Sequence, residues 1–374
     1  MSERTVNEYF PEEVSPPGET LQETIEYHGM TQGQLAERMG RPKKTINEII
    51  KGKAAITEDT AIQLERVLGV PASFWMNRER HYREALARRR ERERLAEQIE
   101  WLKSIPLNEM IKKKWIRKYK DKVDQLVEVL GFYRIASPEQ WGELESAYVT
   151  NFRFRQSKAS NVDYPALISW LRRGEIVASQ MRCESFDLAK FRGALAKIRA
   201  LTEAMPDDFH VQIQNLCAQC GVAVIFVPEL SKIATNGATR WLTSDKALIQ
   251  LNLRGKRADI FWFTFFHEAG HIVLKHPKSD IFISTSKKDV GAIKDRRELE
   301  ADRFAADFLI PPADFNRFTD QFEYASGTER EQLISSFAKE IRMAPGIVVG
   351  RLQNDKYLKW SEFNQLKMKL DWED

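Results

Sequence analysis

The sequence is poor in cysteine and has no long uninterrupted hydrophobic run. Its 3 cysteines, Cys183, Cys217 and Cys220, are too few and odd in number for a disulfide framework, so we expect a reducing compartment. The most apolar stretch, 260–274, is too short to span a bilayer and is interrupted by polar residues. The first residues carry no apolar segment of the signal-peptide type. We therefore expect a cytoplasmic protein without a membrane partner.

A strong net charge is also missing, because 58 basic residues face 54 acidic ones and leave a formal charge of +4. This balance excludes no partner by itself. A hydrophobic content of 43% is ordinary for a globular protein, and 374 residues predict two or three domains of about 100–200 residues each. Cys217 and Cys220 form an isolated C-x-x-C pair, which we interpret as buried small hydrophobic residues rather than as a redox or zinc site.

Short helical patterns with sharp stops fill the region from Glu19 to Trp75 and predict a domain of five helices. Thr31 and Thr57 are N-cap candidates, and glycines follow the periodic segments. The segments 31–40 and 42–52 have the spacing of a helix-turn-helix. The residues expected to pack these two helices together are Leu35, Ala36, Ile46 and Ile49.

The second of these helices is expected to meet DNA. Its start and outer face carry Lys43, Lys44, Thr45 and Asn47, where base edges and phosphates are contacted. Gln32, at the start of the preceding helix, is expected to contact a backbone phosphate. Residues 16–77 resemble the Xre/HigA class of antitoxin-type repressors. The resemblance implies operator DNA as a partner and a homodimer; a small helical bundle without a DNA role is the alternative.

The middle of the chain is expected to be helical. Residues 78–105 are dense in arginine and glutamate and predict a charged helical linker. Residues 106–205 predict an all-helical region, with apolar residues at helical spacing and prolines at the breaks. The fold class predicted for the whole chain is mainly α with an α+β C-terminal domain.

The last third, residues 206–374, predicts a domain with a small sheet. Gly221–Val227 is a buried strand, and residues 247–253 alternate apolar with polar side chains. We expect this second strand to be the edge to which an extended peptide substrate adds, although an internal strand fits the pattern equally well. A long apolar helix follows, then a short strand near 281–283 and a helix near 297–309.

The apolar helix carries His267-Glu268-Ala269-Gly270-His271, an H-E-x-x-H motif. Two histidines one helical turn apart can bind one Zn²⁺ ion, and Glu268 beside them can take a proton from a water molecule at the metal. The neighbouring residues are apolar nearly all round the helix, so these side chains are buried and need a partner. A metal ion satisfies all three at once.

A catalytic zinc site needs a third protein ligand. Glu298 is the predicted third ligand, and Asp302, on the same helix face, is the predicted acceptor for the N–H of a ligand histidine. Glu300 is the alternative ligand, although it lies about 200° round the helix from Glu298, at about 100° per residue. His276, five residues after His271, is expected to lie off the ligand face.

The motif and the later E-L-E-A-D-R-F-A-A-D-F-L-I-P-P run resemble the ImmA/IrrE family of metallopeptidases over about residues 207–355. The resemblance implies a zinc peptidase of the gluzincin type that acts on transcriptional repressors. Carried over to this chain, it implies His267, His271 and Glu298 as ligands and Glu268 as the general base.

The combination predicts a DNA-binding regulator whose zinc endopeptidase domain cleaves a regulatory protein. A second hypothesis is an autorepressing antitoxin of a toxin–antitoxin or phage-defence operon, in which the peptidase-like domain binds a cognate toxin or senses a signal with little or no proteolysis. A third is a DNA-binding module with a structural zinc site.

Overall fold

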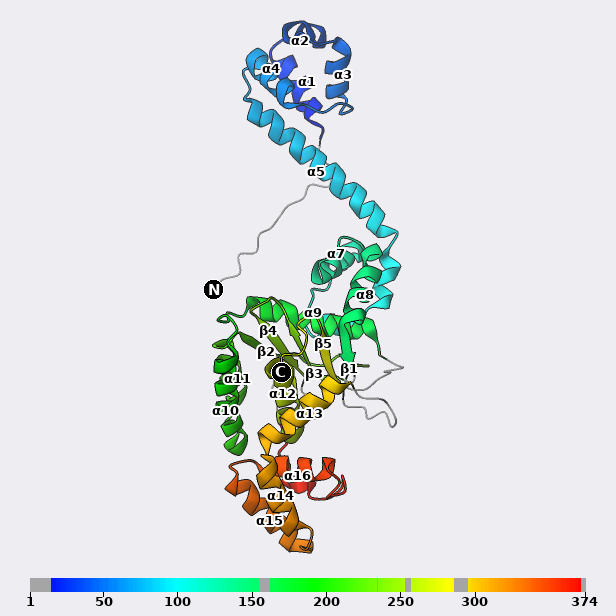
Figure 1. The fold of residues 1–374 in the computed structure, drawn as a ribbon. Coiled ribbons are helices and arrows are strands. Elements are labelled where there is room, and N and C mark those ends of the chain that lie inside the picture. The colour runs from blue at the N-terminus through cyan, green and yellow to red at the C-terminus, as the bar shows by residue number, and fades with distance from the viewer. Residues whose placement is uncertain (1–14, 155–161, 234, 253–256, 286–294, 371–374) are drawn as a thin grey trace. The chain divides into compact units, whose positions relative to one another are not determined.

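The computed structural model describes residues 15–154, 162–233, 235–252, 257–285 and 295–370, and the chain divides into two compact units, residues 1–99 and 100–374 (Figure 1). Most described residues are helical, and the strands lie in the second unit, which confirms the predicted fold class. No helix within these ranges is long and apolar enough to cross a membrane.

The first unit consists of the five predicted helices, which are α1 (Pro17–Tyr27), α2 (Gln32–Met39), α3 (Lys43–Ile50), α4 (Glu58–Leu68) and α5 (Ala72–Ala96). Thr31 caps α2 by accepting the backbone N–H of Gln34, whose side chain returns the bond. Thr57 caps α4, and Gly40 and Gly69 end α2 and α4 in the left-handed conformation that glycine adopts without strain. The helix boundaries therefore follow from local capping.

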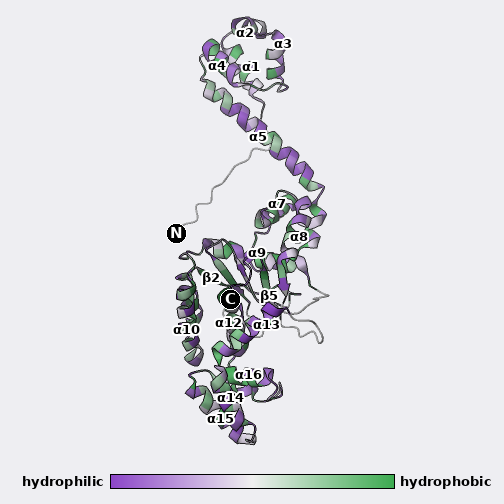
Figure 2. Ribbon diagram, in the orientation of Figure 1, coloured by the Kyte–Doolittle hydropathy of each residue, from purple (hydrophilic) through white to green (hydrophobic). Residues whose placement is uncertain are grey.

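The core of the first unit lies between these helices, and its buried side chains include Leu21, Ile25, Leu35, Ala36, Ile46, Ile49, Leu64 and Trp75. Helix α5 leaves this core and continues as a charged helix, seen as the purple stretch of α5 in Figure 2. Glu79, on α5, is buried and accepts the backbone N–H of Ile56 at 3.1 Å. The fifth helix of the domain and the predicted charged linker are thus largely one helix.

The second unit begins with η1 (Ile99–Ser104), α6 (Leu107–Lys112), α7 (Lys122–Tyr133), η2 (Pro138–Gln140), α8 (Trp141–Asn151), α9 (Tyr164–Gln180) and α10 (Leu188–Ala204). The prediction that 106–205 is all-helical is wrong at one point, because Phe152–Phe154 forms strand β1. Three residues are too short for an alternating pattern to stand out, and β1 is defined by its pairing with a strand from the last third.

The sheet of the second unit contains β1 and four later strands, β2 (Val222–Phe226), β3 (Thr235–Trp241), β4 (Ala247–Leu251) and β5 (Ile281–Thr285). Their order is β1-β5-β3-β4-β2, with β3 antiparallel to both of its neighbours. The expectation that 247–253 is an edge strand is therefore wrong: β4 is internal and every residue of it is buried, while residue 253 lies outside the described ranges. Both faces of β4 are covered, which favours its nearly continuous apolar run.

Helices cover the two faces of the sheet. Ala247, Ile249 and Leu251 belong to the core that also contains α11 (Phe209–Ala218) and α12 (Ala258–Val273), and this core includes the buried thiols of Cys217 and Cys220. The intervening Gln250 donates to the carbonyl of Trp170 on α9 at 2.7 Å. Helix α9 therefore lies on the opposite face from α12, and the predicted middle region shares a compact unit with the last third.

The remaining helices pack beyond α12 and are α13 (Arg296–Leu309), α14 (Pro312–Phe322), α15 (Gly327–Glu340), α16 (Pro345–Asn354) and η3 (Asn364–Leu366). Helix α13 makes extensive contacts with α12, and α16 contacts α12 and α15. The predicted domain limits 16–77, 78–105, 106–205 and 206–374 stay predictions. The two compact units meet between residues 99 and 100, which lie inside the predicted linker.

Candidate metal centre and nucleic-acid interface

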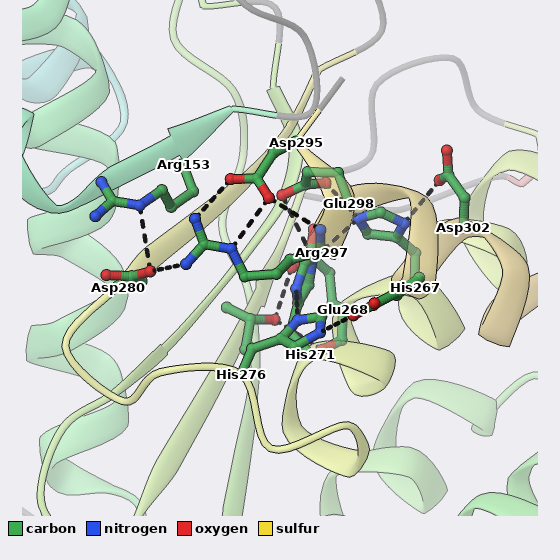
Figure 3. Close-up of polar contacts among 12 residues, drawn as sticks. Arg153, His267, Glu268, His271, His276, Asp280, Asp295, Arg297, Glu298 and Asp302 are labelled. Atoms are coloured by element: carbon green, nitrogen blue, oxygen red, sulfur yellow. Dashed lines mark hydrogen bonds and ion pairs between the residues drawn. The ribbon is translucent and has the colours of Figure 1, made fainter. Parts of the chain in front are cut away.

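Helix α12 positions the histidine pair. It is apolar on nearly all sides, which buries 14 of its 16 residues between the sheet and the neighbouring helices. His267 and Glu268 are fully buried and His271 is 2% exposed. Because they are four residues apart on one helix, His267 and His271 face the same side, with their ring centroids 4.9 Å apart (Figure 3).

Three possible metal-ligand atoms converge at this point. Glu298 Oε2 lies 3.1 Å from His267 Nε2, and Glu298 Oε1 lies 3.6 Å from His271 Nε2. The two histidine Nε2 atoms are 3.1 Å apart. The structure therefore places His267, His271 and Glu298 in one cluster capable of holding a metal ion, as the sequence predicted.

The hydrogen bonds behind these rings determine which lone pairs face the cluster. His267 Nδ1 lies 2.9 Å from Asp302 Oδ1, where it donates a proton to the carboxylate predicted for this role. A neutral His267 then presents an unprotonated Nε2 to the cluster. Glu298 adds a carboxylate, and its Oε1 is buried without a hydrogen bond among the described residues. A metal ion between these acceptors would satisfy them together.

The spacing of the cluster fits zinc. In a tetrahedral site with zinc–ligand distances of about 2.0–2.1 Å, the ligand atoms lie about 3.3–3.4 Å from one another. The observed separations of 3.1, 3.1 and 3.6 Å bracket this value. Two imidazoles and one carboxylate are also a ligand set that catalytic zinc uses. The residues present therefore fit a zinc ion.

Small residues let α13 bring Glu298 to α12. A Cβ atom added to Gly270 would lie 3.0 Å from Phe304 Cδ1 and 3.4 Å from Ala301 Cα, so the helices leave no spare room here. Glu300, the alternative ligand, lies away from the cluster. Its half-exposed side chain contacts Arg296 and His276 instead.

Glu268 faces strand β3. Thr239 Oγ1 donates to Glu268 Oε2 at 2.6 Å, and a Cβ atom added to Gly237 would lie 2.8 Å from Glu268 Oε1. Burial raises the pKa of Glu268 to about 7, against the lowering effects of His267 and of the Ser284 and Thr239 hydroxyls. A carboxylate with such a pKa can exchange a proton near neutral pH.

Two aromatic rings support His271, and sequence reasoning missed both roles. Phe282, on β5, stacks on His271 with a centroid distance of 4.0 Å and an interplanar angle of 16°. His276 lies off the ligand cluster, as expected, but its Nδ1 is 2.9 Å from His271 Nδ1. The chain reaches this position because Lys275 adopts a positive φ of 57° after α12 and turns His276 back. A non-glycine residue in this conformation leaves no clear sequence signal.

A network of charges flanks Glu298 (Figure 3). Asp295 caps α13 and pairs with Arg297, which also pairs with the buried Asp280. Asp280 Oδ2 lies 3.2 Å from Arg153 Nε on β1. The edge strand β1 is therefore tied to the helix that carries Glu298, a link that the sequence did not indicate.

The predicted DNA-binding residues lie on or beside α3 in the first unit. Lys43 and Lys44 are exposed at the start of α3, whose N-cap Pro42 supplies no side-chain hydrogen bond, so the first backbone N–H groups lack a cap. Thr45 and Asn47 are half-buried. Phosphate oxygens suit such a helix start.

Gln32 takes part in a chain of amides that the sequence did not reveal. Asn47 Nδ2 donates to Gln32 Oε1 at 3.3 Å, and Gln32 Nε2 donates to Gln22 Oε1, on α1, at 2.9 Å. These bonds join α1, α2 and α3 and orient both predicted contact residues, Gln32 and Asn47.

Two family models match the chain. One describes a helix-turn-helix and matches residues 21–75; the other belongs to peptidase family M78, describes an IrrE N-terminal-like domain and matches residues 219–343. The chain joins a helix-turn-helix domain to an IrrE-like domain. Both resemblances predicted from the motifs are confirmed. The histidine pair and Glu298 lie inside the IrrE-like match.

Two curated relatives match the helix-turn-helix domain. The HTH-type transcriptional regulator YddM of Escherichia coli is 31% identical over 61 residues, 16% of this chain and 65% of that protein. Virulence-associated protein I of Dichelobacter nodosus is 36% identical over 67 residues, 18% of this chain and 62% of that protein. The chain thus spans about two thirds or less of the length of each of these relatives.

Solved structures of antitoxins are similar to the same region. A HigA-family antidote protein from Coxiella burnetii is 28% identical, with a TM-score of 0.21, and the match covers 22% of this chain and 92% of that one. Pseudomonas aeruginosa HigA with its promoter is 32% identical, with a TM-score of 0.20, and the match covers 20% and 83%.

Proposed function

We propose that the protein is a DNA-binding regulator whose IrrE-like domain is a zinc-dependent endopeptidase acting on a protein partner. The observation that carries the enzymatic half is the convergence of His267 Nε2, His271 Nε2 and Glu298 in the buried interior beside Glu268. His267, His271 and Glu298 are the proposed ligands. Asp302 is the proposed orienting residue for His267, through its 2.9 Å contact.

Each side chain has a chemical task in this proposal. His267, His271 and Glu298 would hold the zinc ion, which would supply Lewis-acid activation of a carbonyl and of a water molecule. Glu268 takes the proton of the attacking water and returns it to the leaving amine, a role that its position beside the ligand cluster allows. Thr239 holds Glu268 Oε2 at 2.6 Å and so fixes the direction of the carboxylate.

Replacement of Glu268 by glutamine tests the enzymatic half. The zinc-loaded full chain is incubated with a proteome-derived peptide library, and new N-termini are identified by mass spectrometry. We expect the wild type to give a defined set of cleavages and Glu268→Gln to lose them by about 10²–10⁴-fold, because proton transfer is lost. Zinc content should not change. Glu323→Gln, an exposed carboxylate on the same unit, is the control and should cleave normally. An inactive, zinc-loaded wild type would contradict the proposal.

The DNA half of the proposal rests on the uncapped start of α3 with its two exposed lysines. We propose that α3 enters the major groove of an operator and that two copies of the chain bind two half-sites. Duplexes are enriched from a random pool with the wild type and then titrated. Thr45→Ala with Asn47→Ala should weaken binding by about 1–3 kcal/mol per lost base contact. Unchanged affinity for the enriched duplex would place recognition elsewhere.

A second candidate is an antitoxin whose IrrE-like domain binds a toxin or signal without turnover. The full burial of Glu268 favours it, since a substrate must reach this carboxylate for cleavage. The two candidates differ in the effect of Glu268→Gln in cells: loss of regulation supports cleavage, and retained regulation supports binding alone.

A further inference from the structure

We propose that His276 and Glu300 are positioning residues for His271, and that together they fix which nitrogen of that ring faces the metal. The inference rests on the proposed zinc site and explains how one of its ligands is prepared for binding. It concerns residues behind the ligand cluster, on the loop after α12 and on the outer side of α13.

The contacts form a continuous chain from the metal ligand to the protein surface. His271 Nδ1 lies 2.9 Å from His276 Nδ1, and His276 Nε2 lies 3.3 Å from Glu300 Oε2. The other carboxylate oxygen of Glu300 accepts from Arg296 Nε at 2.8 Å. His276 is buried and Glu300 is half-exposed, so the chain runs outward from the buried cluster.

Hydrogen-bond chemistry gives this chain one direction. A neutral imidazole has one N–H and one lone pair, whereas an ionised carboxylate only accepts. Glu300 therefore requires the proton of His276 on Nε2, which leaves His276 Nδ1 as an acceptor. His271 must then carry its proton on Nδ1, and its Nε2 lone pair faces His267 and Glu298. Through these two hydrogen bonds, the negative charge of Glu300 selects the Nδ1–H tautomer of His271, which leaves Nε2 free to bind a metal.

The two proposed ligand histidines both carry their proton on Nδ1, but different partners hold it there. His267 donates directly to Asp302, whereas His271 donates to His276, which in turn donates to Glu300. The opposite tautomer of His271 would place its N–H between the ligand atoms, 3.1 Å from His267 Nε2, and so put a proton where the metal would bind. It would also leave two unprotonated Nδ1 atoms 2.9 Å apart, with no proton to join them. The stacking of Phe282 holds the ring plane, but it does not choose between tautomers.

Four variants of the full chain test this relay, the hydrogen-bonded chain from His271 through His276 to Glu300. His276→Leu removes the acceptor, His276→Asn keeps an oxygen near the Nδ1 position, Glu300→Gln removes the charge but keeps an acceptor, and Glu323→Gln is the control. Zinc affinity is measured by competition with a chelator. The tautomer of His271 is read from ¹⁵N imidazole NMR spectra of the metal-free protein. Melting temperatures show that each variant is folded.

We expect His276→Leu to weaken zinc binding by about 10–100-fold, the usual cost of losing an outer partner of a ligand. Its His271 should populate both tautomers, whereas the wild type shows the Nδ1–H form alone. His276→Asn should recover most of the affinity, and Glu300→Gln should lose less than His276→Leu. Folded His276→Leu with wild-type affinity, or with a pure Nδ1–H tautomer, would overturn the relay.

The result also separates the relay from the metal site itself. If the wild type bound no zinc, the proposed function would fail, while a single Nδ1–H tautomer of His271 in the metal-free protein would still support the relay. If zinc bound tightly and His271 showed mixed tautomers in the metal-free wild type, the relay would fail and the zinc site would stand.

Discussion

The two compact units keep their candidate functional residues in opposite environments. In the IrrE-like domain, His267, Glu268 and Glu298 are fully buried, and each contacts at least one other polar side chain. In the helix-turn-helix domain, Lys43 and Lys44 are exposed, and Lys44 Nζ lies a long 3.9 Å from Glu48 Oε1.

The difference shows how each site gains its specificity. A buried polar group costs free energy unless it is paired, so the metal cluster is defined by its internal hydrogen bonds. An exposed lysine carries no such cost, and its contribution comes from its electrostatic interaction with a DNA phosphate on binding. Changes in the first site should therefore alter stability and metal affinity, and changes at the exposed Lys43 and Lys44 should alter DNA affinity alone.

The largest expected effect is that of zinc on the stability of residues 100–374. Zinc that binds the folded state at about 1,000 times its Kd stabilises the protein by about 4 kcal/mol. We expect chelation to lower the melting temperature of this unit in calorimetry, and His267→Ala to abolish the zinc-dependent shift. Because residues 1–99 form a separate compact unit, DNA affinity should stay constant on chelation. A parallel fall in DNA affinity would show that the two sites are coupled.

A smaller effect is expected from Gly237→Ala on β3. The added Cβ would lie 2.8 Å from Glu268 Oε1 and 2.9 Å from Thr264 Cγ2, so side chains must move inside a packed region. We expect a loss of about 1–3 kcal/mol in the free energy of unfolding with zinc binding retained, measured by urea denaturation.

The matched control for this substitution is Gly193→Ala in the middle of α10, where a Cβ meets nothing within 4 Å. It should raise stability by about 0.5–1 kcal/mol through helix propensity. Equal effects of the two substitutions would mean that Glu268 is not held against β3.

The sequence predicted those residues of the candidate site whose relative positions follow from their spacing within one helix. The i, i+4 histidines and the Glu298–Asp302 pair lie on single helices, so their faces follow from helical periodicity. Thr239, Phe282 and His276 reach the cluster from β3, β5 and a left-handed turn. Their positions depend on strand register and on one unusual φ angle, which no local pattern specifies.

The same limit applies to the fold. The five N-terminal helices are bounded by caps and glycines that act within a few residues, and these were predictable. Strand β1 has three residues and exists through pairing with β5, more than 120 positions later in the chain. The internal place of β4 depends on β3, whose Gly237 and charged Arg240 resemble a loop in the sequence but fit between two strands.

The smallest expected effect is the most specific to the exposed site. Lys43→Ala and Lys44→Ala should each reduce the slope of log affinity against log salt by about 0.9, the value for one phosphate contact, on any duplex sequence. Their removal should leave stability nearly unchanged, because an exposed pair such as Lys44–Glu48 contributes little. Arg66→Ala, an exposed cation on α4, is the control and should leave the slope as it is. A salt slope that changes as much for Arg66 as for the two lysines would mean that DNA contacts the whole charged surface of the domain. The metal cluster would then be the better-defined of the two sites.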